Sequence, residues 1–140
     1  MRYVLDTDVI VAAMRSPTGA SAALLLAVLE GRLSMVLSVP LAIEYEAICL
    51  RQEHRLAAGL SEDQVQQFLD GVVTLSEPVG SHFLWRPRLR DPEDEMVLEA
   101  AVNGRADAII TFNARDFGTV PSTFGVSVLS PAEALRRTRP

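Results

Sequence analysis

The chain has 140 residues, a net charge of −5, 49% hydrophobic residues and a single cysteine. It is long enough for one domain with one core, and the lone Cys49, which we interpret as a small buried hydrophobe, excludes an intramolecular disulfide. The acidic balance disfavours simple electrostatic binding to nucleic acid, although bound divalent cations would reverse the charge that a substrate meets. No apolar run approaches the roughly eighteen residues of a membrane span, which predicts a cytoplasmic protein with no membrane contact.

Short apolar strands and helices alternate along the chain. In the first half we predict a strand at Tyr3–Leu5, a helix from Val9 to Met14, a helix over Ser21–Arg32, a strand at Ser34–Ser38, a helix from Pro40 to about Leu50 and an irregular polar connection over Gln52–Gly59. In the second half we predict a helix from the Ser61 cap to Val73, a brief strand within Leu75–Val79, a helix over Asp91–Val102, strands at Ala106–Thr111 and Val126–Leu129, and a helix after Ser130. This alternation predicts a parallel sheet with helices on both faces, in a single domain over residues 1–140.

The segment Ser81–Arg90 contains the only tryptophan, Trp85, and the densest group of arginines, Arg86, Arg88 and Arg90. Such a loop is able to contact a phosphate backbone or to stack on a base. Solvated arginines around a partly buried indole explain the same residues, so both interpretations stay open.

Four acids fall where strands end or where the following helices begin. Asp6 ends the first strand, Glu44 lies on the helix after the second, Asp94 lies in the first turn of a later helix, and Asp116 follows the strand that ends at Thr111. Because the carboxyl ends of parallel strands meet at one edge of a sheet, we expect these acids to share a pocket. Two carboxylates about 5 Å apart repel by roughly 3 kcal/mol at an effective dielectric of about 20, which favours a bound cation. Hard carboxylate oxygens suit Mg²⁺ or Mn²⁺.

Other acids have alternative interpretations. Asp6 itself is also a suitable cap for the helix that follows it. Asp8 is able to approach a metal or to bond the backbone near the helix start. Glu93 and Glu95 are expected to serve the amino terminus of their helix, where negative charge is favourable.

Four segments resemble the motifs of the PIN-domain family in order and spacing. They are Val4–Val9 (VLDTDV), Pro40–Glu44 (PLAIE), Asp91–Ala101 (DPEDEMVLEAA) and Ile109–Phe117 (IITFNARDF). The chain is similar in particular to the small stand-alone PIN proteins that act as toxins of toxin–antitoxin pairs, such as VapC. The resemblance covers nearly the whole chain.

This resemblance implies a three-layer α/β/α sandwich with a central, mainly parallel sheet, and metal-dependent cleavage of RNA. Asp6, Glu44 and Asp94 match the three principal acids of the family, and Asp116 matches the fourth. Some relatives carry an aspartate at the place of Asn113, so either Asp116 or the Asn113 region completes the site. The family also implies a cognate antitoxin as partner, and the apolar helix around Ala22–Leu29 predicts a patch that a second copy or an antitoxin helix covers.

The mechanism that these residues support is hydrolysis of a phosphodiester by a metal-activated water. Asp6, Asp94 and Asp116 are the predicted ligands, Glu44 is a ligand or a water-orienting group, and Thr111 is expected to orient an acid. The sequence pattern places no histidine or lysine as a general acid, which points to a metal-bound water as proton donor.

Two rival functions remain open. Asp6-Thr7-Asp8 after a strand also resembles the haloacid-dehalogenase phosphatases, but these need a later lysine and the chain has none. The second rival is a catalytically silent PIN module that acts through its partner.

Overall fold

The structure, a computed structural model, describes residues 1–80 and 88–138. Its centre is a five-stranded, all-parallel sheet in the order β3-β2-β1-β4-β5. The strands are β1 (Arg2–Leu5), β2 (Ser34–Leu37), β3 (Glu77–Pro78), β4 (Ala108–Ile110) and β5 (Ser127–Leu129). The helices are α1 (Thr7–Arg15), α2 (Ala20–Leu29), α3 (Val39–Cys49), α4 (Gln52–Ala58), α5 (Glu62–Leu75), α6 (Pro92–Asn103), α7 (Ala114–Phe117), α8 (Val120–Thr123) and α9 (Pro131–Thr138).

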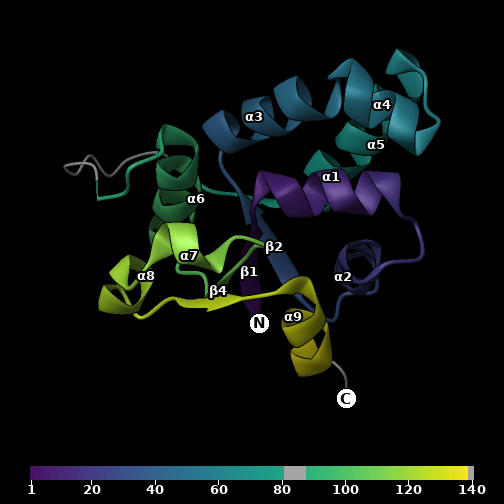
Figure 1. Cartoon of the computed structure of the whole chain (residues 1–140). Helices are drawn as coiled ribbons and strands as arrows, with labels where there is room; N and C mark the ends of the chain where they lie inside the picture. Colours follow the sequence, from purple (N-terminus) through teal and green to yellow (C-terminus); the bar gives the residue numbers. More distant parts are fainter. Residues whose placement is uncertain (81–87, 139–140) are drawn as a thin grey trace.

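The predicted parallel α/β/α architecture is confirmed. Figure 1 shows α1, α2 and α9 on one side of the central strands and α6 on the other. Helix α1 packs against α2 and α3, while α6 contacts β1, β2 and β4. Strand β1 lies in the middle, with Tyr3 paired to Met35 of β2 and to Ala108 of β4. The side chains at its end are therefore surrounded by both neighbouring strands and by the helices that follow them.

The core is built around the central strands and the inner faces of the helices. Tyr3, Val4 and Leu5 of β1 are fully buried, which is typical of a parallel sheet covered on both faces. Tyr45 of α3 is buried as well, and its hydroxyl donates a hydrogen bond to the Leu5 carbonyl at the end of β1. This bond fixes α3 against the strand end at which the site is expected.

Cys49 is fully buried, and burial raises the pKa of its thiol to about 12. The thiol is therefore neutral and shielded at physiological pH, as expected of a structural cysteine rather than a nucleophile.

Gly104 ends α6 where a side chain has no room. A Cβ atom there would lie 2.9 Å from the Ala100 carbonyl and 3.1 Å from Val36 Cγ2. The Gly104 carbonyl accepts hydrogen bonds from Nε and Nη2 of Arg2 at 3.0 and 2.7 Å. The close approach packs the end of α6 against β2, and the hydrogen bonds from Arg2 fasten it to β1.

Several element boundaries match the sequence prediction, and some differ. The capping box is present, because Ser61 Oγ accepts from the Gln64 N–H and Gln64 Oε1 accepts from the Ser61 N–H. Helix α2 ends at Leu29 rather than at the predicted Arg32. The predicted position of Trp85 lies outside the described residues.

The prediction of an irregular connection over Gln52–Gly59 is wrong, because this segment forms α4. None of the α4 residues is buried, so the helix lacks the apolar periodicity that would have indicated it. It ends at Gly59, which has the left-handed φ of +71° that a helix stop commonly uses.

No single helix in the described parts of the chain is long and apolar enough to cross a membrane. Helices α1 and α2 meet the length and composition test only as a pair, and they are bent by 97° at the break between them.

Candidate metal centre

Asp6 lies at the junction of β1 and α1, where it caps the helix and accepts a hydrogen bond from the segment that follows β4. It is 9% exposed, and its Oδ1 accepts the Thr7 N–H at 2.8 Å as the cap of α1. Its Oδ2 accepts a hydrogen bond from Thr111 Oγ1, also at 2.8 Å. The backbone N–H of Asp6 donates to the Ile110 carbonyl at 2.9 Å. The helix cap thus holds the carboxylate at the edge of the sheet.

Asp8, in the first turn of α1, reaches across to the segment after β4. Its Oδ2 accepts hydrogen bonds from the Phe112 N–H at 3.1 Å and from Asn113 Nδ2 at 2.9 Å. Its Oδ1 is buried and forms no hydrogen bond of good geometry with the described residues, although the adjacent Val9 N–H partly offsets the rise that burial causes in the pKa of this carboxyl. A buried carboxylate oxygen without a partner is costly, and a bound cation would satisfy it.

Thr111 connects these acids. Its Oγ1 accepts the Asn113 N–H at 2.9 Å and lies 2.8 Å from Asp6 Oδ2 but 3.4 Å from Asp8 Oδ2. A hydroxyl has one proton to donate, so the shorter distance assigns that proton to Asp6. The predicted role of Thr111 in orienting an acid is confirmed.

The amino terminus of α6 brings further acids to the same edge. Asp91 caps the helix by accepting the Glu93 N–H at 2.9 Å, and Pro92 begins the first turn. Asp94 follows within that turn and is half-buried. Glu95 has another function, because its Oε1 accepts the N–H groups of Arg88 and Leu89 before the helix.

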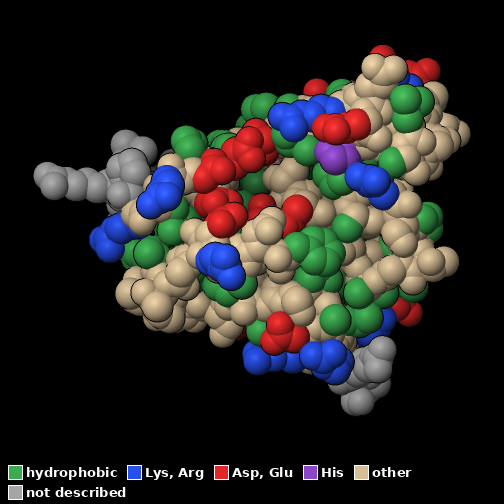
Figure 2. Space-filling model, in the orientation of Figure 1, with side chains coloured by type: hydrophobic (Ala, Val, Ile, Leu, Met, Phe, Trp, Pro, Cys, Tyr) green, Lys and Arg blue, Asp and Glu red, His purple; other side chains and the backbone are tan. Residues whose placement is uncertain are grey.

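The predicted acids Asp6, Asp94 and Asp116 line one pocket of about 320 Å³. The remaining lining residues are Thr7, Asp8, Val11, Ile48, Arg51, His54, Asp91, Glu93 and Asn113. A neighbouring hollow of about 690 Å³ is lined by Arg90, Asp91, Pro92, Asp94, Arg115 and Asp116. Figure 2 shows the red acidic side chains gathered in this hollowed part of the surface, with blue side chains on either side.

Glu44 is the predicted acid that lies apart. It does not line the pocket but is half-buried on α3, which packs against α6. Burial and then a hydrogen bond with the Glu93 carboxyl raise the pKa of Glu44. Glu93 was expected only to serve its helix terminus, yet it lies in the pocket and connects Glu44 to it.

The electrostatics of the pocket favour a positively charged ligand. Burial, the Asp8 charge and the Asp94 charge raise the pKa of Asp6 to about 7, against the lowering effect of hydrogen bonds from Thr111 and Thr7. Burial followed by the charges of Asp91 and Asp116 raises the pKa of Asp94 to about 6. Burial also raises the pKa of Asp8. These carboxylates repel one another when ionised, and a cation would relieve that repulsion.

The residues fit a hard divalent cation that keeps part of its water shell. In the described parts of the chain, no three Asp, Glu, His or Cys side chains converge as a ready-made cage for one ion. Magnesium commonly binds through one or two carboxylates and several waters, so such a cage is not required. The partnerless oxygen of Asp8 and the oxygen-only donor set of Asp6, Asp94 and Asp116 suit this mode of binding.

Sequence patterns missed one wall of the pocket. Arg51 and His54 line it together with the acids, and His54 Nδ1 lies 3.3 Å from Nη1 of Arg15. A guanidinium only donates, so Nδ1 accepts and the proton of a neutral His54 lies on Nε2. Nothing in the sequence indicated that His54 reaches the pocket, because α4, which carries His54, was not predicted as a helix.

Comparisons with known proteins agree with this architecture. Residues 2–115 match the PIN domain. No curated protein sequence is significantly similar to the chain. The fold is similar to a chain in the crystal structure of VapBC2 from Rickettsia felis bound to a DNA fragment from their promoter, with a TM-score of 0.63, 16% identity, and coverage of 93% of this chain and 98% of that one. Since the match spans most of its length and includes every residue that lines the acidic pocket except Asp116, the chain belongs to the PIN-domain family.

Proposed function

We propose that the protein is a metal-dependent endoribonuclease that hydrolyses RNA phosphodiester bonds at the acidic pocket. The observation that carries the proposal is that Asp6, Asp94 and Asp116 line one pocket at the carboxyl ends of the strands, with the pKa of Asp6 raised to about 7 and that of Asp94 to about 6. Acids held together against their mutual repulsion are typical of a site that takes up a cation. PIN domains are generally nucleases, which supports the same conclusion.

Each residue has a definite task in this mechanism. Asp6 and Asp94 would hold one or two Mg²⁺ or Mn²⁺ ions, with Asp116 as a further ligand, directly or through water. Such an ion, when bound, lowers the pKa of a coordinated water and stabilises charge on the scissile phosphate. Thr111 orients the Asp6 carboxylate, and the Phe112 N–H and Asn113 amide fix Asp8. Glu44 acts through Glu93, as a group that orients water at the pocket edge.

The proposal is tested by incubating a single-stranded RNA with the purified protein in Mn²⁺ and in EDTA. We expect cleavage only with Mn²⁺, and none by Asp94→Asn, which removes a charge at nearly constant volume. Glu62→Gln on α5 is the matched control, because it removes an exposed acid that lines neither hollow. Cleavage by Asp94→Asn at the wild-type rate would refute the assignment.

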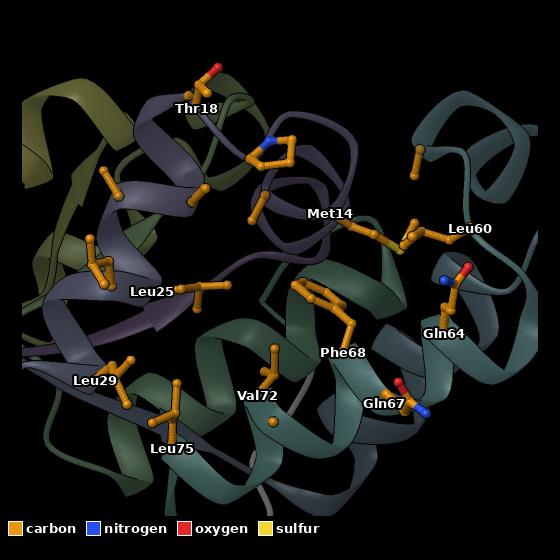
Figure 3. A pocket seen from close by; sticks show the side chains of 18 residues that line it. Met14, Thr18, Leu25, Leu29, Leu60, Gln64, Gln67, Phe68, Val72 and Leu75 are labelled. Carbon is orange, nitrogen blue, oxygen red and sulfur yellow. The ribbon is translucent and has the colours of Figure 1, made fainter.

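We further propose that the protein is the toxin of a toxin–antitoxin pair and that its antitoxin binds an apolar groove of about 890 Å³ between α2 and α5. The structural neighbour described above is a complex of VapBC2, which supports a partner of this kind. In Figure 3 Leu25 and Leu29 of α2 face Phe68, Val72 and Leu75 of α5 across the groove. Exposed apolar surface of this kind is typical of a site that an amphipathic helix covers.

Gly71 supports a closely packed partner. It lines the groove from within α5, where glycine is about 1 kcal/mol less favourable than alanine, and no atom outside its chain neighbours and the α5 backbone lies within 4 Å of the position of its missing Cβ. We expect Gly71→Trp to fill the groove and to abolish binding of the antitoxin while leaving RNA cleavage by the free protein intact.

Light scattering of the pure protein tests the predicted homodimer, and a monomer at high micromolar concentration would contradict it.

A further inference from the structure

Three arginines surround the acidic pocket at different points of its edge. Arg51 lies between α3 and α4 and lines the pocket from that side. Arg90 precedes α6 and Arg115 lies on α7, and both line the neighbouring hollow together with Asp94 and Asp116. Figure 2 shows blue side chains on two sides of the acidic hollow. The positive charge is therefore distributed across the pocket rather than confined to one side.

None of these arginines forms an ion pair within the described parts of the chain, although carboxylates line the same hollows. Elsewhere arginines do pair, as Arg2 does with Glu77 at 2.6 Å and Arg32 with Glu30 at 2.9 Å. All three side chains at the pocket are exposed. Their guanidinium groups are thus available to an external anion, and their fork of donors suits phosphate oxygens.

An exposed aromatic residue is anchored to the same site through its backbone, although its ring lines neither hollow. Phe112 is 55% exposed, between Thr111 and Asn113, which both contact the acids. Its backbone N–H is itself bonded to Asp8, which anchors the residue. A large exposed ring on an anchored backbone is a typical platform for an unpaired base, and duplexes offer no such base.

We propose that Arg51, Arg90, Arg115 and Phe112 form a binding rim for single-stranded RNA, with the arginines on backbone phosphates on both sides of the acidic pocket and the Phe112 ring against one base. This inference rests on the proposed function and names the form of the substrate. The rim also explains how an acidic protein binds an anionic substrate, because its arginines offset the repulsion by the pocket acids.

Fluorescence anisotropy with a labelled, unstructured 12-nucleotide RNA in EDTA measures binding without metal-dependent cleavage. Each arginine–phosphate contact contributes about 0.7 to the slope of log affinity against log salt, which is about fivefold in affinity between 1 M and 0.1 M salt. We expect the combined variant Arg51→Ala, Arg90→Ala and Arg115→Ala to lose about 2 from the slope and about 100-fold in affinity at 0.1 M salt. A duplex of the same sequence should bind more weakly than the single strand.

The matched control replaces Arg32, Arg136 and Arg137 by alanine, since these exposed arginines line neither hollow and their loss changes the net charge equally. Its salt slope should equal that of the wild type. Lysine at positions 51, 90 and 115 should retain most of the slope because the charges remain. An equal loss of affinity in the control would overturn the rim, as would an unchanged slope in the rim variant.

Phe112→Leu separates stacking from apolar bulk, because it keeps a large side chain and the backbone bond to Asp8. We expect it to bind about 5- to 150-fold more weakly and Phe112→Tyr to bind like the wild type. Equal affinity of Phe112→Leu and wild type would remove Phe112 from the rim.

With Mn²⁺ present, rim variants should raise KM more than they lower kcat. If the rim variants lose RNA binding but the wild type never cleaves RNA, the proposed nuclease activity is wrong and the rim is supported. If the rim variants cleave RNA with an unchanged KM, the rim is wrong and the nuclease activity is supported.

Discussion

The acidic pocket and the apolar groove are two hollows built on opposite chemistry. The pocket gathers carboxylates at the carboxyl ends of the strands, where burial and mutual repulsion raise the pKa values of Asp6 and Asp94. The groove exposes leucines between α2 and α5, including Leu26 at 53% and Leu29 at 65%. Each hollow costs free energy when it is filled only by water. In the pocket the carboxylates repel one another without a cation, and in the groove the leucines stay exposed without an apolar partner. Both therefore store free energy that binding can release.

The sharpest way to separate the two hollows is to disable each in turn. Asp6→Asn should reduce metal-dependent RNA cleavage to below detection, because loss of a ligand exceeds the 10- to 100-fold cost typical of disturbing a ligand's hydrogen-bond partner. Leu26→Asp should leave cleavage by the free protein unchanged and should abolish association with a helical partner. Cleavage assays and size-exclusion chromatography of both variants check this. A loss of cleavage in Leu26→Asp would show that the hollows are not independent.

The pocket should also make the metal-free protein less stable as the pH rises. The carboxyl of Asp6 has a pKa of about 7 in the folded chain, above its ordinary value of 3.8, so the unfolded chain releases this proton first. Its contribution to stability is therefore complete below pH 4 and is lost as the pH rises to about 7, by as much as about 4 kcal/mol. Asp94 acts in the same direction up to about pH 6. Urea unfolding in EDTA from pH 4 to 8 measures this, and Asp6→Asn should flatten the profile; an unchanged profile would contradict it.

Thr111→Val tests the hydroxyl that orients Asp6. The variant keeps the shape but leaves the Asn113 N–H without its acceptor and Asp6 Oδ2 without its donor. We expect the free energy of unfolding to fall by about 1–3 kcal/mol at pH 7 and the affinity for Mn²⁺ to fall 10- to 100-fold. Thr111→Ser, which retains the hydroxyl, should keep the metal affinity. Equal affinity of Thr111→Val and the wild type for Mn²⁺ would remove Thr111 from the site.

Gly71→Ala gives the smallest expected effect, in the opposite hollow. The added methyl meets no atom within 4 Å beyond its chain neighbours and the α5 backbone, and it raises the helix propensity of α5, so we expect the free energy of unfolding to rise by about 0.5–1 kcal/mol. Metal-dependent cleavage should not change. Chemical denaturation measures the shift, and a destabilised variant would mean that the groove side of α5 is already in contact with another part of the protein.

Sequence patterns predicted the parts that depend on local rules. Strand β1 is recognisable because an apolar run ends at an acid, and α6 because Asp91, Pro92 and Asn103-Gly104 mark its ends. The carboxyl ends of parallel strands meet at one edge of the sheet, and this expectation correctly placed Asp6, Asp94 and Asp116 in one pocket. Their proposed roles as metal ligands stay predictions.

The parts that were missed depend on how helices pack. Glu44 lies on the expected helix, but the orientation of α3 against α6 places it beside Glu93 instead of in the pocket. His54 reaches the pocket only because α4 forms, and a surface helix without buried residues leaves no periodic signal. The orphaned oxygen of Asp8 is likewise a property of burial, which its sequence neighbours do not reveal.

The central claim is that a cation relieves repulsion among the pocket acids, and the free energy of unfolding with and without Mn²⁺ tests it most directly. At pH 8 we predict that Mn²⁺ at about 100 times its dissociation constant stabilises the wild type by roughly 2.7 kcal/mol. Asp94→Asn, which has one charge fewer to repel its neighbours, should be at least as stable as the wild type in EDTA and should gain much less from Mn²⁺. A variant that is less stable in EDTA and gains the full increment from Mn²⁺ would contradict the account.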